Sequence, residues 1–122
     1  MNTGDIMECY AYALRPAFYP YLSKHPKLLA HLQELQEEQR YQIIIPLDED
    51  DLWERAVFYF NNEHMKLCEH TIYYENTLKK AVYSMRVERE RLIMDQGGDN
   101  PFIPFIKRIF RTLYLCDEKE LG

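Results

Sequence analysis

Residues 47–96 read LDEDDLWERAVFYFNNEHMKLCEHTIYYENTLKKAVYSMRVERERLIMDQ, a stretch of fifty residues without glycine or proline. Two mostly apolar series run through this stretch with a spacing of seven residues. They are Trp53, Phe60, Leu67, Tyr74 and Ala81, and Val57, His64, Thr71, Leu78, Met85 and Leu92. Residues at heptad spacing return to one face of an α-helix. The stretch therefore predicts a long, coiled-coil-like helix over residues 48–95.

A straight helix over these residues would be too long for one small subunit. It would measure about 70 Å at 1.5 Å per residue, whereas a compact chain of this size is about 35–40 Å across. The helix could break near Asn61-Asn62, because asparagine is common at both ends of helices. Alternatively, it could stay whole and pair with a second chain along the heptad seam. We take the break as the first expectation.

The remaining segments are also predicted to be mainly helical. A first helix is expected from Asp5, and a second from Pro26, since proline is common at the first helical position. Residues 41–46, YQIIIP, predict a buried extended linker, because β-branched residues favour extended backbone. A last helix is expected over residues 101–115. The predicted fold of the single domain 1–122 is all-α, an irregular bundle of four or five helices dominated by the long third helix.

The composition is that of an acidic globular protein. The 122 residues are 47% hydrophobic and 14% aromatic and carry a formal net charge of −5, which suits one domain with a real core. Nucleic-acid binding needs clustered lysine and arginine. The arginines at 86, 89 and 91 alternate with glutamates instead, as is typical of a solvated face. We expect a protein partner, of basic charge, and no nucleic acid.

Cysteine usage and hydropathy indicate a cytoplasmic protein. Cys9, Cys68 and Cys116 form no C-x-x-C pair and are odd in number, as expected of reduced thiols. The chain shows neither a secretory signal nor an apolar stretch of the ~20 residues that a membrane-spanning helix needs. The 101–115 helix has an apolar and a basic face and would also suit a membrane surface. We expect it to close the bundle, with no membrane partner.

No recognisable pattern points to catalysis or to a cofactor. The phosphate-binding, dinucleotide-binding and nucleophile-elbow motifs are missing from the sequence. His64 and Cys68 stand four residues apart, a spacing that can bind a metal on a helix. Two ligands do not complete a site, so we expect a hydrogen-bonded core histidine, no metal and no enzyme. A metal-binding or enzymatic helical protein that uses His64 and Cys68 is the least favoured of three functional classes, after a protein-binding module and a self-assembling protein.

The candidate partner-binding residues are one acidic cluster and one tyrosine. The cluster opens the predicted third helix, where carboxylates also stabilise the helix dipole. Tyr73 stands out in a chain with ten tyrosines, because its neighbour Tyr74 belongs to the apolar series and Tyr73 projects elsewhere. The predicted binding residues are Asp48, Glu49, Asp50, Asp51, Glu54 and Tyr73.

Together these features favour a small, non-catalytic protein-binding module. An inhibitor that acts by direct contact, of the toxin-immunity or phage anti-defence type, fits the small size and the acidic charge. The alternative is a self-assembling structural or adaptor protein that forms a homodimer through the heptad seam.

Overall fold

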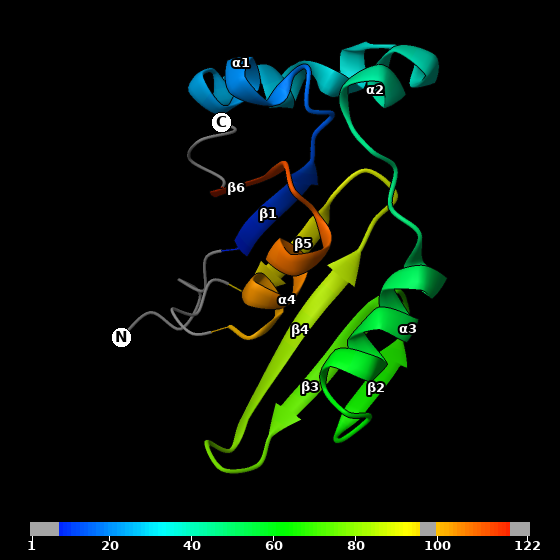
Figure 1. Cartoon of the computed structure of the whole chain (residues 1–122), viewed down its shortest axis with the longest axis vertical. Coiled ribbons are helices and arrows are strands. Elements are labelled where there is room, and N and C mark those ends of the chain that lie inside the picture. The colour runs from blue at the N-terminus through cyan, green and yellow to red at the C-terminus, as the bar shows by residue number, and fades with distance from the viewer. Residues whose placement is uncertain (1–7, 96–99, 118–122) are drawn as a thin grey trace.

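The centre of the molecule is a six-stranded antiparallel sheet with the strand order β2-β3-β4-β5-β1-β6 (Figure 1). The computed structural model describes residues 8–95 and 100–117. Within these residues there are five short helices, one of them the 3₁₀-helix η1. In chain order the elements are β1 (Glu8–Ala13), α1 (Tyr19–Lys24), η1 (Pro26–Glu34), α2 (Glu37–Ile43), α3 (Glu49–Tyr59), β2 (Met65–Cys68), β3 (Thr71–Asn76), β4 (Ala81–Val87), β5 (Leu92–Asp95), α4 (Phe102–Ile109) and β6 (Leu113–Asp117).

The expected all-α bundle is therefore wrong, and so is the long helix over residues 48–95. Only α3 is helical in this region, and the chain then forms the four antiparallel strands β2 to β5. The apolar residues that suggested a heptad seam belong to the core of a sheet. Met65 and Leu67 on β2 and Ile72 and Tyr74 on β3 alternate with outward residues, as strand geometry requires. The coiled-coil-like character inferred from the spacing does not exist.

The helix α3 ends where two asparagines follow it. Asn61 has φ 57° and Asn62 has φ 55°. The Asn62 N–H donates to the carbonyl oxygen of Val57 at 2.7 Å, and the Asn61 N–H donates to that of Phe58 at 3.3 Å. These two bonds form a Schellman motif, which satisfies the last carbonyl groups of a helix and reverses the chain. The chain beyond this point enters β2 rather than a second helix.

The tight turns of the sheet contain no glycine, which explains why the sequence lacks the usual hairpin signal. Glu69 and His70 form the two-residue turn between β2 and β3, with φ 50° and φ 67°. Such a turn normally contains Asn-Gly, because both residues need positive φ. Lys80, in the β3–β4 connection, has φ 51°. A stretch without glycine or proline was therefore compatible with three hairpin turns.

The other predicted helices also change. Residues 8–13, expected in the first helix, form strand β1, and the predicted start at Asp5 lies outside the described residues. The linker predicted over residues 41–46 is helical through Ile43 and becomes extended only at Ile44, which forms a bridge with Leu14. The last predicted helix ends at Ile109, and β6 follows it. β1 offers two rows of backbone partners, to β5 and β6, that a helix could not use.

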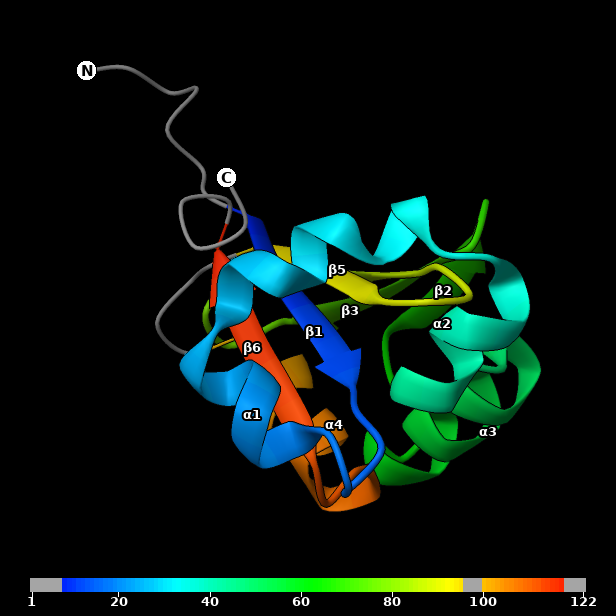
Figure 2. The same cartoon turned by 90° about the horizontal axis from the view of Figure 1, so that it is seen from above.

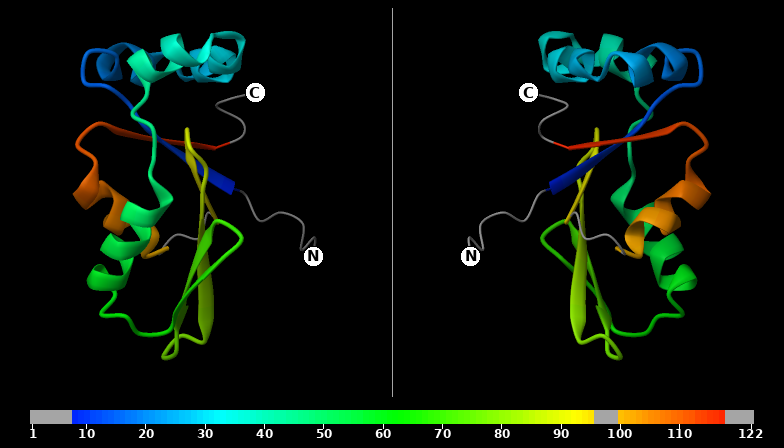
Figure 3. Two further views of the ribbon diagram at one scale, coloured as in Figure 1. Left: turned by 90° about the vertical axis from the view of Figure 1, so that its right-hand side faces the viewer. Right: turned by 90° about the vertical axis from the view of Figure 1, so that its left-hand side faces the viewer.

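Two hydrophobic cores lie on opposite faces of β1. Cys9, Ala11 and Ala13 face the larger core, which α3 and α4 cover. Tyr10 and Tyr12 face the smaller core, which α1, η1 and the segment around Ile44 cover. The short helices α1, η1 and α2 lie at one end of the molecule (Figure 1), and the view onto that end shows them spread across it (Figure 2). Within the described part of the chain, no helix covers the outer face of β2, β3 and β4 (Figure 3).

The predicted heptad seam is not available to a second chain. Trp53, Phe60, Leu67 and Tyr74 pack against the larger core. The rings of Phe60 and Tyr74 are stacked with their centroids 4.5 Å apart. These side chains are apolar because they close the gap between α3 and the sheet, so the seam gives no basis for a coiled-coil homodimer.

Candidate functional site

The acidic start of α3 combines a structural carboxylate with exposed ones. Asp48 is the N-cap residue, and its Oδ1 accepts hydrogen bonds from the backbone N–H groups of Asp50 (3.0 Å) and Asp51 (3.3 Å). Asp51 forms an ion pair with Arg55 at 2.9 Å, and Glu49 lies 2.5 Å from the imidazole Nδ1 of His70. Asp48 is therefore needed to begin the helix.

Asp50 and Glu54 are the free carboxylates of this helix. Both side chains are exposed, and neither forms an ion pair with any residue that the structure describes. Asp50 lies in the first turn of α3, where the helix dipole stabilises a carboxylate, whereas Glu54 lies beyond that turn. Their negative charge is directed to solvent and is available to a partner.

Phe58, which is not among the predicted binding residues, lies on the same side of α3 as Asp51 and Glu54. Phe58 is 86% exposed. It follows Glu54 by four residues and Asp51 by seven, so the three side chains lie on one face of the helix. Phe58 falls out of phase with the buried positions Leu52 and Ala56, and the fold rather than the sequence decides which of these phases faces the sheet. The exposed face of α3 thus combines negative charge with a large apolar ring.

A groove separates α3 from α4 beside Phe58. Its volume is about 960 Å³, and its walls include Tyr59 on α3 and Phe105 and Ile109 on α4. The guanidinium of Arg108 lies 5.8 Å from the centroid of the Tyr59 ring. Apolar walls and a mixed charged rim are the surface that a partner's amphipathic segment requires. We call Asp50, Asp51, Glu54, Phe58 and this groove the α3 face.

Tyr73 does not belong to the α3 face. Its neighbours Ile72 and Tyr74 pack in the larger core under α3, so Tyr73 projects from the opposite face of the sheet. There it lies in register with Lys66 on β2 and Ser84 on β4. The acidic cluster and Tyr73, predicted as contacts of one partner, are therefore on different sides of the molecule.

His64 and Cys68 do not share a helical face. His64 lies in the turn before β2, and Cys68 is the last residue of that strand. Four residues of extended chain span about 13 Å, so the spacing that suggested a metal pair has no helical basis. Within residues 8–95 and 100–117 there is no group of three or more histidine, cysteine, aspartate or glutamate side chains arranged to bind a metal ion.

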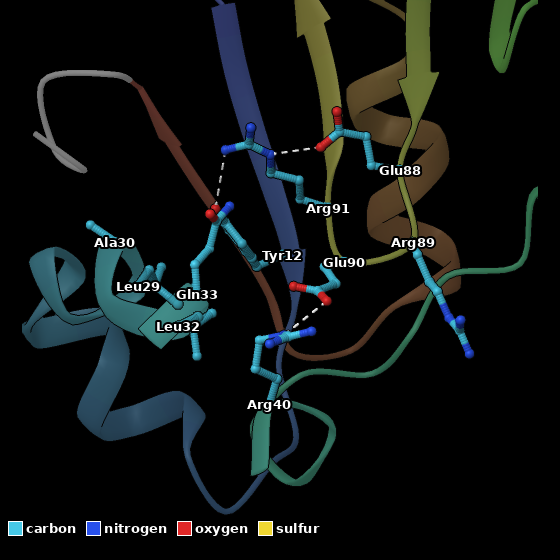
Figure 4. Close-up of a pocket in the computed structure, with 10 residues that line it drawn as sticks. All are labelled: Tyr12, Leu29, Ala30, Leu32, Gln33, Arg40, Glu88, Arg89, Glu90 and Arg91. Carbon is cyan, nitrogen blue, oxygen red and sulfur yellow. Dashed lines mark hydrogen bonds and ion pairs between the residues drawn. The ribbon is translucent and has the colours of Figure 1, made fainter. Parts of the chain in front are cut away.

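A second hollow lies on the other side of β1, between η1, α2 and the β4–β5 turn (Figure 4). Its volume is about 420 Å³. We call it the charged cavity, because two arginine–glutamate pairs line it. Arg40 Nε lies 2.9 Å from Glu90 Oε2, and Arg91 Nε lies 3.0 Å from Glu88 Oε1. Its lining residues are Tyr12, Leu29, Ala30, Leu32, Gln33, Arg40, Glu88, Arg89, Glu90 and Arg91.

Tyr12 and Arg91 shift one another's titration in this cavity. Burial raises the pKa of the Tyr12 phenol above its ordinary value, although the hydrogen bond from Arg91 opposes this effect. Burial alone would lower the pKa of Arg91, but hydrogen bonds with Glu88 and Tyr12 raise it. At neutral pH the phenol is therefore neutral and the guanidinium charged. Groups with shifted pKa values in a cavity are candidates for ligand binding.

Comparison of the sequence with protein-family models and with curated proteins supplies no relative from which a function could be transferred. No protein-family model matches the sequence, and no curated protein matches it. The described residues contain no helix with the length and apolar character needed to cross a membrane. The two surfaces above are therefore interpreted from their own residues.

Proposed function

We propose that this protein is a non-catalytic protein-binding module that uses the α3 face to bind a basic segment of a partner protein. The observation that carries the proposal is the 86% exposure of Phe58 beside Asp51 and Glu54. An inhibitor of the toxin-immunity or phage anti-defence type, acting in the cytoplasm, is the biological role that we propose for such a module.

Phe58 supplies the apolar part of the interaction. Fully burying a phenylalanine side chain contributes about 1.5–3 kcal/mol, and nearly all of this remains to be gained because the ring is in water. Exposed aromatic residues at the centre of an interface commonly carry much of its binding energy. Tyr59 and Ile109, both half-buried, extend the apolar surface from Phe58 into the groove, which the buried Phe105 also lines.

The carboxylates select the charge of the partner. Asp50 and Glu54 form no ion pair among the described residues, so they can attract lysine or arginine without breaking an existing contact. Complementary charge mainly speeds association and excludes partners of like charge. The occupant that suits the α3 face is therefore a segment with basic residues beside a large apolar side chain, which would enter the groove.

A displayed library of random peptides, selected on the immobilised full chain, tests this proposal. The recovered peptides should place lysine or arginine next to a large apolar residue. Their affinity should fall about 30-fold or more for Phe58→Ala, which corresponds to about 2 kcal/mol. Asp50→Lys should mainly slow their association. Leu78→Ala is the matched control, because Leu78 is 95% exposed at the β3–β4 turn, outside the α3 face.

Two results would contradict the proposal. One is a failure to enrich any peptide that distinguishes the native chain from Phe58→Ala. The other is a set of peptides whose binding depends on Leu78 or on Tyr73 rather than on Phe58. Concentration-dependent dimerisation that Phe58→Ala abolishes would identify a second copy of the chain, instead of a foreign partner, as the occupant.

A further inference from the structure

We propose that the charged cavity binds a small molecule that carries one oxyanion, a carboxylate or a phosphate, on an apolar body. This inference does not depend on the α3 face. It rests on the donors that line the cavity, on the wall that faces them and on the volume enclosed between them.

The cavity has more hydrogen-bond donors than its own carboxylates can use. A guanidinium has five N–H donors. The Glu90 carboxylate accepts a hydrogen bond from Nε of Arg40. The carbonyl oxygen of Leu35 accepts one from Nη1 of Arg40 at 2.6 Å. The Glu88 carboxylate accepts a hydrogen bond from Nε of Arg91. Each guanidinium thus uses its Nε and one N–H of Nη1, and among the described residues its other three N–H groups have no acceptor that could replace an incoming oxyanion.

Tyr12 adds a further donor between the arginines and the helix. Its hydroxyl oxygen accepts from Arg91 Nη1 at 3.5 Å. Because burial keeps the phenol protonated, the hydroxyl proton is directed away from Arg91. Within the described chain no other hydrogen bond of this hydroxyl occurs. Figure 4 shows Tyr12 between Arg91 and the side chains of η1, and Arg40 below Tyr12.

The opposite wall suits the apolar part of a ligand. Leu29, Ala30 and Leu32 line the cavity from η1. Arg89 turns away from the other charged side chains in Figure 4, and its guanidinium lies 5.4 Å from the centroid of the Tyr41 ring. The volume of about 420 Å³ falls in the range of about 300–1,000 Å³ that is typical of small-molecule sites. A ring or a short aliphatic chain with one anionic group fits these dimensions.

The glutamates are competitors of the ligand. Glu90 also accepts a hydrogen bond from the Tyr41 hydroxyl at 3.5 Å, so its carboxylate is held in place beside Arg40. An incoming oxyanion must share Arg40 with this carboxylate and is repelled by its charge. Neutralising Glu90 while keeping its shape should therefore strengthen binding, whereas a purely structural ion pair would give no such gain.

The test uses three small probes and the full chain. Benzoate and phenyl phosphate carry the proposed oxyanion, and benzamide is the neutral control for benzoate. Saturation-transfer NMR and titration of amide chemical shifts should detect benzoate binding with a dissociation constant on the order of 1 mM. The shifted amides should cluster at Tyr12, Leu32 and Glu90. Comparison of benzoate with phenyl phosphate distinguishes a carboxylate site from a phosphate site.

Variants separate a binding site from a structural cluster. Arg40→Met should weaken benzoate binding at least tenfold, Glu90→Gln should strengthen it severalfold, and Leu78→Ala should leave it unchanged. If Arg40→Met fails to fold, the opposite effects expected of Glu90→Gln and Tyr12→Phe still decide the question, because Tyr12→Phe removes a donor and should weaken binding. Two results would overturn the proposal. One is equal binding of benzoate and benzamide. The other is the absence of any shift at Tyr12 when benzoate and phenyl phosphate are each added at a concentration about 20-fold above the expected dissociation constant.

Discussion

Lys80→Gly should stabilise the protein, because Lys80 holds a backbone conformation that favours glycine. Lys80 has φ 51° in the connection between β3 and β4. The left-handed conformation costs a residue with a Cβ atom about 1–2 kcal/mol, and glycine avoids this cost. Glycine also makes the unfolded chain more flexible, which offsets about 0.4–1 kcal/mol. The net gain in unfolding free energy should be about 0.5–1 kcal/mol.

Two variants of the same connection provide the controls. Lys80→Ala removes the charge and keeps the Cβ atom, so it should change the unfolding free energy by less than about 0.5 kcal/mol. Thr77→Gly should destabilise the protein, because Thr77 is not among the residues with positive φ and gains only flexibility in the unfolded state. Asn76 keeps the turn closed in all three variants, since its Oδ1 accepts from the backbone N–H groups of Leu78 and Lys79 at 3.1 Å.

Urea denaturation followed by circular dichroism measures these differences. The midpoint should rise for Lys80→Gly and fall for Thr77→Gly, with an unchanged dependence on urea concentration. In a thermal scan, Lys80→Gly should raise the melting temperature by about 2–5 °C. If Lys80→Gly destabilised the protein as much as Thr77→Gly, Lys80 would not hold the left-handed conformation on which this prediction rests.

Three further variants test the core, the helix cap and the buried phenol. Phe102→Ala should cost about 3–5 kcal/mol of unfolding free energy in urea, because Phe102 is fully buried, whereas Phe58→Ala should cost less than about 0.5 kcal/mol. Asp48→Ala should cost about 1 kcal/mol in the same assay, since it removes the cap of α3. Because burial raises the pKa of Tyr12 above 10.0 in the folded protein, the stability that this group contributes is complete below pH 10.0 and is lost as the pH rises through the folded pKa. Tyr12→Phe lacks this ionisable group, so its unfolding free energy should fall less than that of the native chain between pH 8 and 11.

The heptad series identified some core residues correctly but assigned them to the wrong secondary structure, and it also included His64 and Leu78, which are exposed. Leu67, Tyr74 and Met85 were expected to face the interior, and all three pack in the larger core. Heptad spacing and strand alternation select overlapping residues over short segments, and the turns between strands reset the phase. The decisive information was in the turns, where glutamate, histidine and lysine adopt positive φ. Because these residues rarely do so, no local rule placed the β2–β3 and β3–β4 hairpins there.

The candidate site could be anticipated only in part. The acidic cluster was visible because capping chemistry places carboxylates at a helix start, and α3 begins where Asp48 predicts. The exposure of Phe58 was hidden, because it depends on which side of α3 the sheet covers. The charged cavity joins residues 50 positions apart, such as Arg40 and Glu90. Pairing over that distance is decided by the strand order, which the sequence did not reveal.

The α3 face and the charged cavity can be tested independently, because they lie on opposite faces of β1. Ala11 points toward the core under α3, and Tyr12, the next residue, lines the charged cavity. Phe58→Ala should therefore leave benzoate binding unchanged, and Arg40→Met should leave peptide binding unchanged. A variant that removed both activities would have damaged the sheet between the two sites, and its melting temperature would fall. Loss of one activity with an unchanged melting temperature would locate the effect at that site alone.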